Sequence, residues 1–169
     1  MNIKNVLGIG FFLSLSIFSL YSMHESLQEQ QQRLMNRILD NNLCAVQALL
    51  NEGLDPNFYG GRYSDRTPLQ TAVYRNNYGI VEALLDHKAN PNFTEEISGT
   101  PFHEPGTLGR PFYIAAMNNN ISIMKLLIQR GANWRLHYNA IVYDQGTFIA
   151  EPTKRWLKEY VTPQPRGAE

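Results

Sequence analysis

Apolar residues in the middle of the chain follow two short helical patterns that a polar turn separates. Residues 67–73 carry apolar side chains at positions i, i+3 and i+4, and residues 78–85 repeat this spacing. Such spacing gives a segment one apolar face, as in a helix that lies against a core. Thr67-Pro68 is a favourable helix start, and Asn76-Asn77 tolerates the left-handed backbone of a tight turn. We therefore predict two helices joined by a turn.

Neither predicted helix is long enough to be stable alone, so the pair needs neighbours. The loop that follows the second helix, Lys88–Asn92, has counterparts on both sides of it, at Gly53–Phe58 and at Gly131–Trp134. These loops recur at intervals of about 35 and about 43 residues. The wider interval contains a long insertion at residues 94–109, rich in proline and glycine, which forbids a regular helix there. The pattern indicates a stack of helix pairs.

The segment Thr67–Ala72 resembles the Thr-Pro-Leu-His-x-Ala signature of ankyrin repeats, with Gln70 in place of histidine. The third unit, Arg110–Ala116, keeps the proline and the alanine pair, whereas the first unit, Gln32–Asn57, keeps only its second helix. Weaker signatures are expected in terminal repeats, because one side of each faces water. The resemblance implies an all-α ankyrin-repeat solenoid, with repeats at about residues 32–58, 67–93 and 110–135.

Further elements are predicted on both sides of these repeats. Ser26–Glu29 matches a capping box, which predicts a first helix running to about Asp40. Residues 140–143 and 147–150 are rich in residues that favour strands and flank a turn with glycine, so we predict a short β-hairpin. A last helix from Glu151 is expected to cap the stack. The predicted domain spans residues 23–162, with hairpin and capping helix at 139–161 and a tail at 163–169.

The N-terminus has the pattern of a targeting segment. Lys4 precedes an apolar run from Val6 to Leu20, and polar residues follow. This order is that of a secretory signal peptide, with small Ser22 near the expected cut. The run is short for a transmembrane helix, which needs about 20 residues. We interpret residues 1–22 as a signal peptide for export, secreted or periplasmic; an uncleaved membrane anchor and a buried core helix are the alternatives.

Composition excludes several function classes. The formal charges balance to zero, so there is no basic excess that would favour nucleic acid. Cys44 is the single cysteine, so no intrachain disulfide or CxxC pair exists. The histidines, including His103 and His137, show no metal-ligand spacing, and the chain has neither a phosphate-binding glycine loop nor a G-x-S-x-G motif. We predict no catalytic, cofactor or metal site, and no small-molecule substrate.

The resemblance implies that the chain binds another protein, through residues before the Thr-Pro signature and the two residues after its Ala pair. Tyr74 and Arg75 also lie off the apolar stripe, so the core does not require them. Tyrosine and arginine are enriched at binding hot spots. With two residues of the long insertion, the candidate binding residues are Tyr63, Ser64, Arg66, Tyr74, Arg75, Met117, Asn118, Phe102 and His103. The alternative is that Tyr74 packs against its neighbouring repeat and the arginines only aid solubility.

Three functions agree with these observations. The one we favour is an exported, non-enzymatic protein-interaction module; a secreted effector that acts in a host would be one example. The second is a membrane-tethered structural adaptor in which residues 1–22 remain in place. The third is a small enzyme with its site in the insertion at residues 94–109, where His103 and Glu104 are adjacent.

Overall fold

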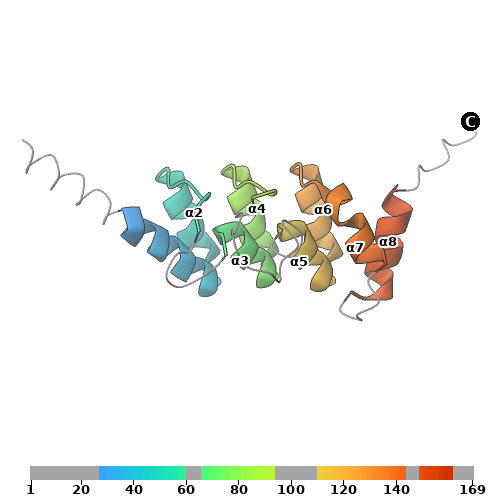
Figure 1. The fold of residues 1–169 in the computed structure, drawn as a ribbon. Coiled ribbons are helices and arrows are strands. Elements are labelled where there is room, and N and C mark those ends of the chain that lie inside the picture. The colour runs from blue at the N-terminus through green and yellow to red at the C-terminus, as the bar shows by residue number, and fades with distance from the viewer. Residues whose placement is uncertain (1–26, 60–65, 94–109, 144–148, 162–169) are drawn as a thin grey trace, which may run out of the picture.

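The structure is a computed structural model that describes residues 27–59, 66–93, 110–143 and 149–161. The helices form pairs, and the pairs stack side by side in chain order (Figure 1). The pairs are the helix at residues 27–39 with α2 (Leu43–Asn51), α3 (Pro68–Tyr74) with α4 (Tyr78–Asp86), and α5 (Pro111–Met117) with α6 (Ile121–Gln129). After them come the 3₁₀ turn η2 (Trp134–His137), α7 (Tyr138–Val142) and α8 (Glu151–Val161). The predicted all-α solenoid is confirmed.

The start of α3 shows how Gln70 replaces the histidine of the signature. The Thr67 side chain accepts a hydrogen bond from the Gln70 backbone N–H at 3.1 Å, and Gln70 Oε1 accepts one from the Thr67 backbone N–H at 2.7 Å. This reciprocal pair is a capping box. Both side chains are buried, so the bonds satisfy polar groups that water cannot reach. The predicted Thr67 cap is therefore confirmed.

An Asn-Asn turn joins the two helices of every pair. In each turn the first asparagine has φ near +56°, and the side chain of the second accepts a hydrogen bond from the backbone three residues later, which caps the next helix. The turns are Asn41-Asn42, Asn76-Asn77 and Asn119-Asn120. The three first helices therefore end in register, although the first unit lacks the signature.

The loops after the second helices tie neighbouring repeats together. Asp55 Oδ1 accepts a hydrogen bond from the Asn57 backbone N–H at 2.9 Å, as expected of a local turn. In addition, Asn57 Nδ2 donates to the Lys88 carbonyl at 3.0 Å, and Asn57 Oδ1 accepts from the Asn90 backbone at 2.7 Å. Asn92 makes the same pair of bonds to the third repeat. These side chains serve the contact between repeats as well as their own turns.

The prediction of a β-hairpin is wrong at its first strand. Residues 140–142 belong to the helix α7, and residues 149 and 150 form no strand. Ile141 and Val142 are buried in α7, which packs against α8 and continues directly from η2. His137 and Ile141 are four residues apart, so in a helical backbone both face inward. Burial on that face overrides the strand preference of the β-branched residues.

The last helix covers the C-terminal end of the stack. Leu157 in α8 is fully buried, and Asn119 Oδ1 accepts hydrogen bonds from the Ala150 backbone at 2.6 Å and from Thr153 Oγ1 at 3.1 Å. Trp156 and Tyr160 are four residues apart on one face of this helix, and their ring centroids lie 5.5 Å apart. The predicted capping helix is thus observed.

Several expectations lie outside the described residues. These are the signal peptide, the capping box at Ser26, the insertion at 94–109, the hairpin turn at 144–146 and the tail. None of the helices within the described ranges is both long and apolar enough to cross a bilayer.

Candidate functional site

The first helices of the three pairs expose a row of large apolar side chains near their C-terminal ends. Leu39, Tyr74 and Met117 are 44, 53 and 39 % exposed. Each of them lies two residues before the left-handed asparagine of its turn. A single exposed apolar residue needs no explanation, but apolar side chains that recur over neighbouring elements are typical of an interaction site. We call Leu39, Tyr74 and Met117 the apolar row.

Asn118 fixes the relative position of two members of this row. Its Nδ2 donates to the backbone carbonyls of Val73 at 3.1 Å and Tyr74 at 3.2 Å. Asn120 Nδ2 donates to Asn76 Oδ1 at 3.2 Å in the adjoining turn. The ends of α3 and α5 are therefore held side by side, and Asn118 is half-buried with its amide in the contact between repeats. That it also binds a partner stays a prediction.

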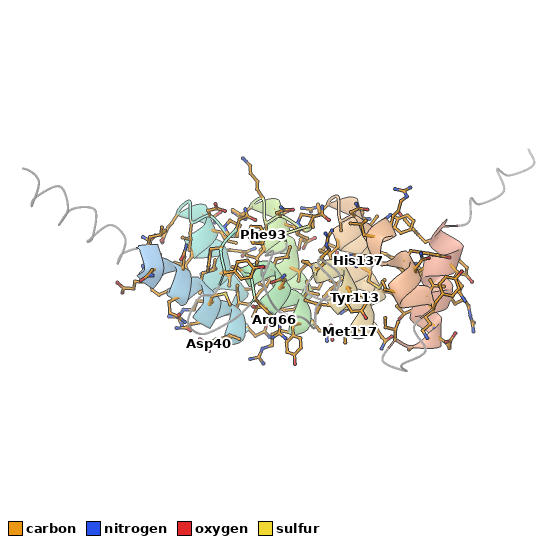
Figure 2. All side chains as sticks on the ribbon, viewed as in Figure 1. Asp40, Arg66, Phe93, Tyr113, Met117 and His137 are labelled. Atoms are coloured by element: carbon orange, nitrogen blue, oxygen red, sulfur yellow. The ribbon has the colours of Figure 1, made fainter. Side chains whose placement is uncertain are left out.

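Arg66 lies over the ring of Tyr74. The guanidinium carbon is 4.3 Å from the ring centroid, a cation–π contact between the residue before the N-cap of α3 and the last residue of the helix. The contact pre-orders two residues of the types found at binding hot spots. Arg75 is also exposed at the C-cap of α3. In Figure 2, Arg66 and Met117 lie along the lower edge of the stack, as does Asp40.

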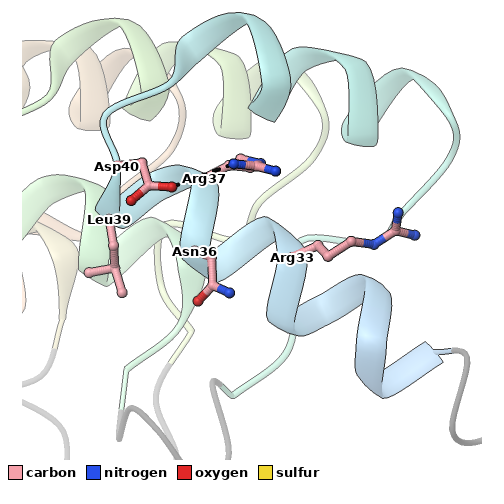
Figure 3. Close-up of a pocket in the computed structure, with 5 residues that line it drawn as sticks. All are labelled: Arg33, Asn36, Arg37, Leu39 and Asp40. Carbon is pink, nitrogen blue, oxygen red and sulfur yellow. Dashed lines mark ion pairs between the residues drawn. The ribbon is translucent and has the colours of Figure 1, made fainter.

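An open concavity of about 300 Å³ lies at the Leu39 end of the row (Figure 3). It is lined by Arg33, Asn36, Arg37, Leu39 and Asp40. Arg37 Nη1 and Asp40 Oδ2 are 3.6 Å apart and both side chains are about half exposed, so this ion pair adds little stability. The residues that line the concavity thus include a basic side chain, Arg33, as well as Leu39, the first member of the apolar row.

A buried polar cluster lies away from the row, between α5 and η2. His137 is 1 % exposed, with its ring 6.3 Å from Phe112 and 6.0 Å from Tyr113. Burial, together with the positive charge of Arg110, lowers the pKa of His137 to about 4. Within the described residues, neither ring nitrogen of His137 nor Nε of Arg110 has a hydrogen-bond partner. The imidazole is therefore neutral near pH 7, and the cluster acts on stability.

The structure brings four predicted binding residues to one edge of the stack. Arg66, Tyr74, Arg75 and Met117 are all exposed there. The alternative reading of Tyr74, as packed against the next repeat, does not fit a side chain that is 53 % exposed.

Four other predicted residues cannot be placed in this way. Tyr63, Ser64, Phe102 and His103 lie outside the described residues, and their role stays a prediction.

Leu39 is a candidate that the sequence analysis missed. The first repeat has lost the Thr-Pro signature, so its first helix had no anchor for alignment. Matching Asn41-Asn42 with Asn76-Asn77 would have placed Leu39 at the position of Tyr74.

Comparison with known families identifies the repeat. A family model described as ankyrin repeats (3 copies) matches residues 17–95 and 34–138, which together make up most of the chain. The chain belongs to the ankyrin-repeat family. Ankyrin repeats suggest a protein–protein interaction module, and the family is typically non-enzymatic. No curated protein matches the sequence.

Proposed function

We propose that this ankyrin-repeat protein is exported from the cytoplasm and binds another protein, without enzymatic activity, through the exposed side of its first helices. The apolar row is the observation that carries the proposal. Leu39, Tyr74 and Met117 leave apolar area in water at equivalent positions of three repeats, although the solenoid does not require it. A partner that covers the row would remove that area from water and gain the hydrophobic free energy.

The polar residues beside the row support a protein partner in particular. The Arg66 guanidinium lies over the Tyr74 ring, and Arg75, exposed at the C-cap of α3, follows Tyr74 directly in the chain. A tyrosine with adjacent arginines combines apolar area with hydrogen-bond donors, and hot spots built in this way carry about 2 kcal/mol or more each. Tyr63, Ser64, Phe102 and His103 lie outside the described residues and remain further candidates for binding the same partner.

A surface variant tests the binding face. Tyr74→Ala/Arg75→Ala/Met117→Ala should keep the fold, because all three side chains are exposed. We expect the protein partner to be lost, with affinity at least about 100-fold lower. The measurement is affinity capture with quantitative mass spectrometry, followed by titration of the captured partner.

A matched control variant removes side chains of similar types at exposed positions outside the proposed binding face. Tyr143→Ala/Arg135→Ala/Leu136→Ala removes a tyrosine, an arginine and an apolar residue at exposed positions around η2 and α7. It should retain the partner. If the first variant is folded and binds every partner as the wild type does, the binding face is not the one proposed here.

Export is tested on the N-terminus of the protein made in its own cells. Mass spectrometry should find that about the first 20 residues are missing, as cleavage of a signal peptide requires. An intact N-terminus in the membrane fraction would instead favour the membrane-tethered adaptor. An intact N-terminus in the cytoplasm would remove both interpretations.

A further inference from the structure

We infer that the apolar row binds an acidic amphipathic helix whose apolar anchors recur every seven residues; this inference rests on the proposed function. The inference specifies which class of protein segment binds the exposed side of the first helices. Three features of the described residues carry it: the spacing of the row, the kind of side chain in it, and the charges beside it.

The spacing of the row matches the repeat of a helix. Packed helices lie about 8–10 Å apart, so neighbouring members of the row are separated by about one such step. Seven residues of an α-helix advance about 10.5 Å and return close to the same face. Anchors at i, i+7 and i+14 of one partner helix would therefore meet Leu39, Tyr74 and Met117 in turn. In a β-strand, side chains on one face recur about every 6.6 Å, which does not match this step.

The side chains in the row favour a helix over a polyproline segment. A polyproline II helix advances about 9.3 Å in three residues, so its spacing alone would also fit. However, proline-rich segments dock in grooves lined by aromatic residues. Two members of the row, Leu39 and Met117, are flexible aliphatic side chains, which are typical of surfaces that hold amphipathic helices.

The charges beside the row favour an acidic partner. Among the described residues on and next to the first helices, the exposed charged side chains are Glu29, Arg33, Arg37, Asp40, Arg66 and Arg75. Four of these six side chains are arginines and two are carboxylates, so the described residues on and next to the first helices carry a positive excess even though the whole chain is neutral. Complementary charge selects the partner and speeds its association.

The distribution of charge also predicts the orientation of the helix. The exposed arginines belong to the first two repeats, as do Leu39 and Tyr74, whereas the Met117 end adjoins the start of α8, where Asn119 accepts a hydrogen bond from the Ala150 backbone. Glu151 follows there and is strongly exposed, although it is paired with Lys154 at 3.3 Å. The acidic residues of the partner should therefore surround the anchors on Leu39 and Tyr74, and be absent near the anchor on Met117.

The test is a peptide selection against the complete protein, isolated from the cells that make it by a C-terminal tag. The probe is a displayed library of about 21-residue peptides, with helical, extended and proline-rich members, long enough for three anchors in a helix. Enriched peptides should be helical and acidic, with apolar residues at i, i+7 and i+14. Enrichment of proline-rich, extended or basic peptides, or of none, would overturn the inference.

Variants then connect the selected peptide to the row. Arg66→Glu/Arg75→Glu should lower the affinity at least about tenfold and flatten its dependence on salt. Arg135→Glu, a charge reversal outside the row, should not. A peptide with lysine in place of its glutamates should lose binding to the wild type and regain it on Arg66→Glu/Arg75→Glu.

The two proposals fail in different ways. If selected peptides lose affinity for Tyr74→Ala/Arg75→Ala/Met117→Ala but lack the seven-residue pattern or the acidic charge, the helix inference is wrong and the binding face stands. If they bind that variant as tightly as the wild type, both the inference and the proposed face are wrong.

Discussion

Leu84→Ala should lower the free energy of unfolding by about 2–5 kcal/mol. Leu84 is fully buried in α4, which packs against α3 of its own repeat and against α2 and α6 of the neighbouring repeats. Removing its side chain leaves a cavity at the contact between three repeats, in addition to the lost transfer free energy. Because each repeat is stabilised by its neighbours, a defect in the central one weakens the whole stack.

Urea unfolding followed by circular dichroism measures the effect, with Leu136→Ala as the matched control. Leu136 is 53 % exposed in η2, so the same chemical change there should alter stability by less than about 0.5 kcal/mol. A loss below about 0.5 kcal/mol for Leu84→Ala would mean that α4 does not lie between its neighbours as described.

The central repeat could be predicted because its local and tertiary signals agree. Thr67 caps α3, Asn76 takes the left-handed turn, and the apolar period places Leu84 in the core; each of these was readable from a few neighbouring residues. When propensity, capping and burial favour the same structure, the sequence alone is informative.

The segment after the third repeat was misread because its conformation depends on distant contacts. Ile141 and Val142 favour a strand by their branched side chains. They are helical because α8 packs on α7, a contact between segments that no local pattern joins. Tertiary packing overrides local propensity there, as it commonly does in short segments.

The candidate site could be predicted only in part, because some of its contacts also join segments that are distant in the sequence. Tyr74 and Met117 could be identified because they hold equivalent positions after the alanine pair of the ankyrin signature, and Tyr74 also falls off the apolar stripe of its helix. The two hydrogen bonds from Asn118 to the carbonyls of Val73 and Tyr74 could not be predicted, because these partners lie on α3 of the preceding repeat, far back in the chain. The Arg110–His137 cluster likewise joins α5 to η2 and has no signal in either segment.

The free energy of unfolding should fall by about 2–3 kcal/mol more between pH 7 and pH 4.5 in the wild type than in His137→Phe. Burial and Arg110 lower the pKa of His137 from 6.5 to about 4, so the folded state favours the neutral ring. The unfolded chain takes up the proton at higher pH than the folded one. The contribution of the neutral His137 ring to the free energy of unfolding is therefore fully present above about pH 6.5 and is lost as the pH falls toward 4.

Urea unfolding at a series of pH values measures this difference, and comparison with His137→Phe removes the effect of the carboxylates, which titrate alike in both proteins. Phenylalanine keeps a ring beside Phe112 and Tyr113 and has no group to protonate. Only the change of the free energy of unfolding with pH is compared. A difference in stability that the larger phenylalanine ring causes equally at every pH therefore does not affect the comparison. Equal pH dependence in the wild type and His137→Phe would show that the ring is not enclosed beside Arg110.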